Sequence, residues 1–193
     1  MQNKKTKINI YDMAVVGVMA AIIFVITYFI RIPVATPVGE TQLKLANAFC
    51  LLAGILFGGV RGGLAAGIGS MFFDLLNPKY IASAPFTLVF FFLMAFVCGV
   101  ISHSANAKGE KTVKNIIASL AGGFTYYLLY LTKTVVERML EGAVFNAAIV
   151  SIVPKIITSG INLVVAVVIA SVLAPILKKA LNSSGFYKKI DIA

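Results

Sequence analysis

The chain has 193 residues, of which 60% are hydrophobic and 12% are charged, and its mean hydropathy is +0.95. Soluble domains carry roughly 25% charged residues, so this composition excludes an ordinary soluble protein and predicts a single transmembrane domain over 1–193. The net charge of +10 does not indicate a nucleic-acid partner, because the basic residues fall between apolar runs rather than on one basic surface.

The first apolar run, 13–30, follows a lysine-containing segment, 1–12. It is longer than the ~7–15 apolar residues usual in a signal peptide, so we expect an uncleaved span with a cytoplasmic N-terminus. Ala14, Gly17 and Ala21 lie at i, i+3 and i+7 on one face of this helix. Small residues let another transmembrane helix approach closely, so this face is predicted to dock a partner helix.

Two apolar segments rich in small residues, 45–60 and 62–76, follow a polar connection, 31–44. Small residues permit close helix packing in lipid, and we expect the two segments to form a helical hairpin of two short spans. Both segments are shorter than the ~20 residues that cross a bilayer comfortably. A re-entrant loop is therefore the alternative, and it would leave every later orientation unchanged.

Three more spans are predicted in the second half, at 86–102, 115–135 and 154–177, with the helix of the fifth continuing toward Glu141. Pro154 suits the first turn of the last helix, where its missing N–H is not needed. The expected fold is an all-α integral membrane protein, a six transmembrane helix bundle with cytoplasmic N- and C-termini. This orientation places most of the 17 Lys and Arg residues on the cytoplasmic side, as the positive-inside rule requires.

Polar groups inside apolar spans are costly in lipid, so each is a candidate for function. On the fifth helix, tyrosines, a lysine and a glutamate recur at i, i+4, i+7 and i+11 and share one face. The sixth helix has a polar stripe that starts at the same outer end. We predict a substrate pocket in the outer half, lined by Asn47, Asp74, Lys79, Tyr126, Tyr130, Lys133, Glu137, Lys155, Ser159 and Asn162.

Aromatic rings for stacking, with amides and charges for orientation, suit a small polar molecule that contains a ring. In the alternative interpretation, Lys79, Lys133, Glu137 and Arg138 are interfacial anchors or local ion pairs. Asn47 would then be a hydrogen-bonding link between helices.

The sequence offers little for catalysis or metal binding. Cys50 and Cys98 lie inside apolar runs, and His103 is the single histidine. The chain contains no HExxH, GxSxG or P-loop motif. It is therefore predicted to have no enzyme activity, no metal site and no cofactor.

Three segments carry a resemblance to a known family: LANAFCLLAGILFGGVRGGLAAGIGSMFFDLL, SLAGGFTYYLLYLTKTVVE and PKIITSGINLVVA. With six expected spans and a small-residue first helix, the chain resembles a substrate-binding S component of an energy-coupling factor (ECF) vitamin transporter. The resemblance implies a subunit that binds a micronutrient from outside and delivers it by reorienting in the membrane. Its implied partners are a transmembrane coupling subunit, contacted through small residues of the first helix, and two cytoplasmic ATPase subunits.

The sequence does not determine which vitamin is bound. Folate, pantothenate, riboflavin, a pyridoxine-like compound and a queuosine precursor are all compatible with the residues. An excess of basic groups at the outer side favours a neutral or carboxylate-bearing ligand over a cation such as thiamine. The alternative function is a stand-alone small permease or an oligomeric channel. A channel requires polar groups through the whole membrane depth, whereas here they concentrate in the outer half.

Overall fold

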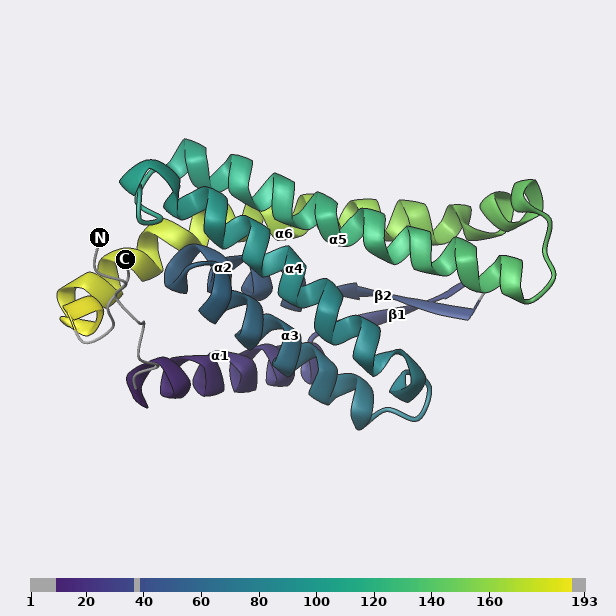
Figure 1. The fold of residues 1–193 in the computed structure, drawn as a ribbon, viewed down its shortest axis with the longest axis horizontal. Coiled ribbons are helices and arrows are strands. Elements are labelled where there is room, and N and C mark those ends of the chain that lie inside the picture. The colour runs from purple at the N-terminus through teal and green to yellow at the C-terminus, as the bar shows by residue number, and fades with distance from the viewer. Residues whose placement is uncertain (1–9, 37–38, 189–193) are drawn as a thin grey trace, which may run out of the picture.

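The computed structural model describes residues 10–36 and 39–188. In this part of the chain six α-helices form an elongated bundle, with a two-stranded β-hairpin between the first two helices (Figure 1). The elements are α1 (Ile10–Phe29), β1 (Arg31–Thr36), β2 (Gly39–Lys44), α2 (Ala46–Phe57), α3 (Gly59–Leu75), α4 (Ala84–His103), α5 (Thr112–Leu140) and α6 (Phe145–Ser183). Three short 3-10 turns, Ile81–Ser83, Ser104–Asn106 and Phe186–Lys188, complete the described chain.

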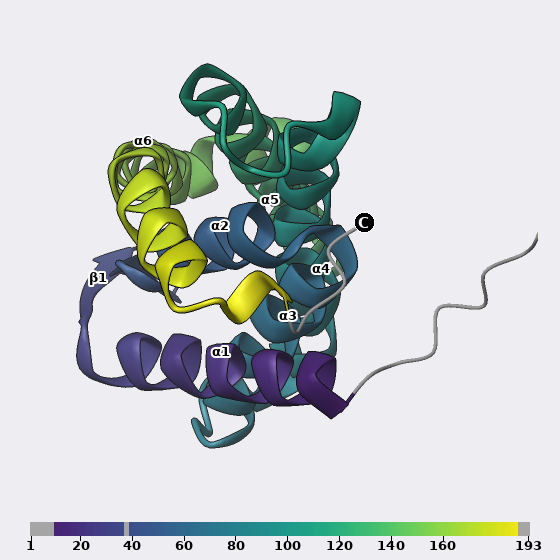
Figure 2. The same ribbon diagram turned by 90° about the vertical axis from the view of Figure 1, so that its left-hand side faces the viewer.

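Helix α2 forms the centre of the bundle. Its 12 residues, about 18 Å of helix, are all buried apart from Phe49, which is partly buried. Viewed along the bundle, α2 is enclosed by the other helices (Figure 2). Because protein rather than lipid surrounds α2, the central helix does not need the length of a lipid-facing span.

Glycines allow α2, α3 and α4 to pack at very short distances. A Cβ placed on Gly54 of α2 would lie 2.4 Å from the carbonyl oxygen of Ala95 in α4, and one on Gly99 of α4 would lie 2.4 Å from the amide nitrogen of Gly59. Gly58, with φ of +84°, separates α2 from α3. The expected helical hairpin is therefore present, and its small residues serve contact between backbones.

Three helical segments in the described residues are long and apolar enough to cross a membrane: Ile10–Phe29, Ile81–His103 and Phe145–Ser183. Helix α5 has the extent expected for the fifth helix, ending one residue before Glu141.

The prediction that Pro154 starts the last helix is wrong, because α6 begins at Phe145 and Pro154 lies inside it. Proline removes one backbone hydrogen bond from a helix interior. Two side-chain hydroxyls donate hydrogen bonds to backbone carbonyls of the same helix in this region. Ser151 donates to Ala148 O at 2.7 Å, and Thr158 donates to Pro154 O at 2.9 Å. Packing along α5 outweighs the local cost of the proline.

The polar connection at 31–44 contains a β-hairpin, for which the sequence analysis made no prediction. Strands β1 and β2 pair antiparallel, with Arg31 opposite Lys44 and Pro33 opposite Gln42. This hairpin is the exception to the expected all-α fold. Its far end and the α5–α6 connection lie at one end of the bundle, which we call the hairpin end (Figure 1). The start of α1 and the end of α6 lie at the opposite end.

Candidate ligand-binding cavity

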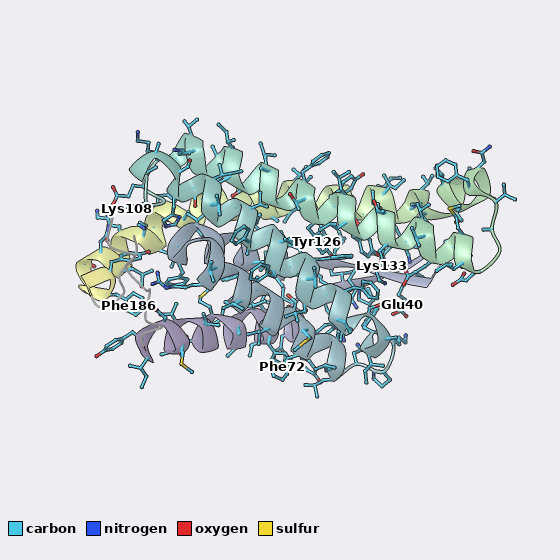
Figure 3. The ribbon with its side chains drawn as sticks, viewed as in Figure 1. Glu40, Phe72, Lys108, Tyr126, Lys133 and Phe186 are labelled. Carbon is cyan, nitrogen blue, oxygen red and sulfur yellow. The ribbon has the colours of Figure 1, made fainter. Side chains whose placement is uncertain are left out.

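A cavity of about 550 Å³ lies at the hairpin end, among β2, the start of α2, the end of α3, α4, α5 and α6. All ten residues predicted to line a pocket line this cavity, although they come from five different segments of the chain. Figure 3 shows Glu40 and Lys133 near the hairpin end and Tyr126 nearer the middle of the bundle. Further lining residues were not predicted: Glu40, Thr41, Gln42, Lys44, Tyr80, Ser83, Thr87, Phe90, Phe91 and Thr134.

One wall of the cavity is aromatic. The rings of Tyr126 and Tyr130 are stacked, with centroids 6.0 Å apart and planes within 9° of parallel. The ring of Phe91 in α4 packs on Tyr126 with a centroid separation of 4.6 Å. The i, i+4 spacing places both tyrosines on one face of α5, as expected. This wall offers a flat apolar surface to a planar ligand.

Two of the lysines at the cavity are neutralised by carboxylates. Lys133 Nζ lies 2.6 Å from Glu137 Oε1 and also donates to the hydroxyl of Ser83 at 3.2 Å. Lys79 Nζ lies 2.7 Å from Glu40 Oε1, and this ammonium holds the pKa of the Glu40 carboxyl below its usual value. These contacts agree with the alternative that the two lysines form local ion pairs.

Charged groups without such a pair also line the cavity. Asp74 is 5% exposed, and its Oδ2 accepts a hydrogen bond of 2.5 Å from the hydroxyl of Thr87. Lys44 follows β2 into the cavity, where its ammonium lies 5.3 Å from the centre of the Phe73 ring. Burial lowers the pKa of Lys44, and the charge of Asp74 acts in the opposite direction. The third charged group is Lys155 of α6.

The side-chain amide of Asn162 in α6 bonds to the backbone of β2 and is not left free for a ligand. Its Oδ1 accepts a hydrogen bond from the backbone N–H of Lys44 at 2.9 Å, and its Nδ2 donates to the carbonyl of Gln42 at 2.7 Å. The Asn162 amide therefore bonds to the edge of β2 much as a neighbouring strand would. Through these two bonds it fixes the wall of the cavity that β2 supplies.

The residues that sequence reasoning missed come mainly from β2 and from the start of α4. A sequence signal for the hairpin was present, since Pro37 and Gly39, residue types typical of turns, lie between two short segments, 31–36 and 40–44. Phe90 and Phe91 belong to an apolar run in which every position suits lipid equally well. Only the tertiary structure shows that Phe90 and Phe91, unlike other residues of this run, line the cavity.

The small residues predicted to dock a partner lie on the outside of α1. Ala14, Gly17 and Ala21 are all exposed. A Cβ on Gly17 would have no atom within 4 Å beyond its own stretch of helix. This stripe is therefore open to another helix.

The apolar helices and the polar cavity at one end define a helical membrane protein with space for a small molecule. Its sequence matches the family described as "ECF-type riboflavin transporter, S component" over residues 7–179, and the chain belongs to this family. The resemblance carried by the sequence segments quoted above is confirmed, and the family is one of membrane-embedded S components.

Two relatives are similar over parts of the chain. A UPF0397 protein of Lactiplantibacillus plantarum is 40% identical over 77 residues, which is 40% of this chain and 40% of that protein. The chain thus matches less than half of the length of that relative. The "Uncharacterized protein in gap 3'region" of Pyrococcus woesei is 30% identical over 138 residues, covering 70% of this chain and 88% of that protein.

Proposed function

We propose that this chain binds a vitamin or related micronutrient in the cavity at the hairpin end and delivers it inward together with an ATPase-driven coupling module. The observation that carries the proposal is the cavity itself. It collects polar side chains from β2, from the α3–α4 connection and from each of the helices α2 to α6, and its volume lies within the range of about 300–1,000 Å³ typical of small-molecule sites. In this proposal the ten predicted residues line the substrate site, with Asn162 acting through β2.

The proposed orientation has six spans, cytoplasmic termini and the hairpin end facing outward. The charge bias of the connections supports it, because the α4–α5 connection, with Lys108 labelled in Figure 3, lies at the same end of the bundle as the start of α1 and the end of α6 (Figures 1 and 3). The cavity then opens to the side from which a nutrient arrives.

Riboflavin is the first ligand to test, because the description of the family names it. The aromatic wall on α5 suits a flat ring system. Once the Lys79–Glu40 and Lys133–Glu137 pairs are set aside, two lysines and one aspartate remain at the cavity. This balance disfavours a cationic ligand such as thiamine.

A stand-alone permease or channel is the second candidate function. It requires a polar path that continues toward the opposite end. Next to the cavity, however, the bundle is filled by buried apolar side chains of α2, among them Leu51, Leu52 and Ile55, and these favour a closed pocket over a pore.

Mass spectrometry of small molecules that the purified protein retains tests the proposal directly. A retained micronutrient is expected, together with co-purification of a coupling subunit and two ATPases. Retention of no small molecule and no partner by the folded protein would refute the proposal.

Docking through α1 is tested by Gly17→Leu, with Gly160→Leu on α6 as the matched control. Both are helical glycines at which an added Cβ would meet no atom within 4 Å beyond its own stretch of helix, so the two positions are matched in the space at the Cβ. Gly17→Leu is expected to reduce recovery of the coupling subunit and to leave ligand retention unchanged, whereas Gly160→Leu changes neither. Equal recovery with both variants contradicts docking at Gly17.

A further inference from the structure

A second cavity lies at the end of the bundle opposite the hairpin end. Its volume is about 230 Å³, and it lies between the α4–α5 connection and the last turns of α6. Figure 3 labels Lys108 of this connection at that end. The lining residues are Gly109, Glu110, Pro175, Lys178, Lys179 and Asn182. The two cavities share no described residue, so they are separate sites.

Lys178 places a buried positive charge in the wall of this second cavity. The residue is 6% exposed, and its ammonium nitrogen lies 4.1 Å from the centre of the Tyr187 ring. An ammonium has three N–H groups, and the described residues supply one acceptor, the backbone carbonyl of Lys108. Lys178 belongs to none of the salt bridges of the described chain. A buried cation without an ion-pair partner is costly, so an anion in the cavity would lower the free energy of the site.

The charges around the cavity are mainly positive. The two segments that form its walls, 103–114 and 175–182, contain five lysines and one acidic residue, Glu110. Lys179 and Glu110 are both exposed, and both line the cavity. This excess of positive charge favours an anionic occupant over a cationic one.

The connection that forms one wall is fixed against its neighbours. Asn115 Nδ2 donates to Gly109 O at 2.9 Å, and Gly109 N–H donates to Ser102 O at 3.1 Å. A Cβ on Gly109, whose φ is +72°, would lie 2.5 Å from the carbonyl oxygen of Ile55, so the connection passes directly against α2. The wall is therefore organised before anything binds, which lowers the entropic cost of binding.

The face of α6 that lines the cavity continues along the helix as an exposed apolar stripe. The cavity residues of α6 follow the i, i+3, i+4 and i+7 spacing of one helix face: Pro175, Lys178, Lys179 and Asn182. The same face continues toward the hairpin end with four side chains that are between 48% and 63% exposed: Val172, Val168, Val164 and Ile161. From Val172 to Ile161 this stripe covers about 17 Å of helix, close to the ~15 Å depth of hydrocarbon in one leaflet.

We propose that the second cavity binds the headgroup of one anionic phospholipid, whose acyl chains lie along the apolar stripe of α6. Lys178 and Lys179 donate to the phosphate oxygens, and Asn182 offers its amide to the glycerol part of the headgroup. A phospholipid fits better than a soluble anion, because the cationic cavity and the apolar stripe share one helix face. Basic pockets between transmembrane helices are typical sites for lipid headgroups. This site does not depend on which molecule the cavity at the hairpin end binds.

Lipid exchange on the purified, immobilised protein tests the proposal. The protein is equilibrated in detergent with equimolar phosphatidylglycerol and phosphatidylcholine of identical acyl chains, washed, and extracted for mass spectrometry of the bound lipid. The wild type is expected to retain phosphatidylglycerol over phosphatidylcholine by about fivefold or more. Equal retention of the two lipids would overturn the proposal. This comparison uses the unaltered chain, so it does not depend on the folding of any variant.

Three variants locate the preference. Lys179→Gln is expected to weaken retention of phosphatidylglycerol by about fivefold, the effect typical of one lysine near an anionic lipid. Lys111→Gln is the matched control, because it removes the same charge at the same end but outside the lining, and it is expected to change retention by less than about twofold. Glu110→Gln is expected to strengthen retention, because it removes a carboxylate that repels the headgroup. Equal losses with Lys179→Gln and Lys111→Gln, or weaker retention with Glu110→Gln, would overturn the site.

A wash with millimolar inorganic phosphate separates a lipid from a free anion. Bound phosphatidylglycerol is expected to stay in place, because its acyl chains contribute much of the binding free energy. Displacement by inorganic phosphate would identify a site for free phosphate and overturn the lipid assignment. Loss of the coupling subunit with Lys179→Gln, in a protein without preference for phosphatidylglycerol, would identify a protein contact and also overturn it. Each of these failures leaves the proposed micronutrient site unaffected, because the two cavities are separate.

Discussion

Replacing Asn162 by alanine should release β2 from α6. The side chain is 9% exposed, and its amide makes both the 2.9 Å bond from Lys44 N–H and the 2.7 Å bond to Gln42 O. The substitution removes both bonds and leaves two backbone groups of β2 without their partners. The hairpin then depends on its pairing with β1 and on the exposed Lys79–Glu40 contact.

The size of this effect follows from the two bonds. Each hydrogen bond contributes about 1 kcal/mol net, and an unpaired buried polar group costs about 1–3 kcal/mol. We therefore expect the closed position of the hairpin to be destabilised by about 2–4 kcal/mol relative to its open position. Because about 1.4 kcal/mol corresponds to a factor of ten, the open population should rise by about thirtyfold to several hundredfold.

Amide hydrogen exchange of residues 39–44, followed by mass spectrometry on the purified protein, measures this opening. Asn162→Ala should accelerate exchange there and should lower ligand retention as the open population grows. Thr158→Val is the control, because its hydroxyl bonds only to Pro154 within α6. If retention falls while exchange in 39–44 is unchanged, Asn162 contacts the ligand directly and the reasoning about the hairpin is refuted.

Two further predictions concern packing and pH. Gly99→Ala should destabilise the protein by about 1–3 kcal/mol, because its Cβ would lie 2.4 Å from Gly59 N. Gly160→Ala is the control, and it should be neutral or slightly stabilising because the space at its Cβ is open. If thermal melting in detergent gives the same shift in melting temperature for both variants, the proposed close packing at Gly99 is contradicted. The pKa of Glu40 is lowered from its ordinary value of 4.5 by Lys79, so its contribution to stability is present above pH 4.5 and is lost as the pH falls through the lower folded pKa. The difference in melting temperature between wild type and Glu40→Gln should therefore shrink below that pH and at high salt; a constant difference would exclude the ion pair as its cause.

Helix periodicity was sufficient to predict the cavity face of α5. Tyr126, Tyr130, Lys133 and Glu137 share a face because their spacing follows the helix repeat, and all four line the cavity. The same reasoning failed at Pro154, where a local rule for helix starts competes with packing against α5. The proline was accommodated inside α6 because bundle contacts outweigh the loss of one backbone hydrogen bond.

Composition and periodicity by themselves determined that this is a membrane protein, which helices it contains and which of their faces carry polar groups. These properties depend on residue type and on neighbours within a few turns. The placement of Lys44 and Asp74 around one cavity, and the bonds from Asn162 to a strand 118 and 120 residues earlier, were decided only by the tertiary structure. Contacts between residues so far apart in the chain leave no local pattern, because they exist only after the hairpin has folded onto the end of the bundle.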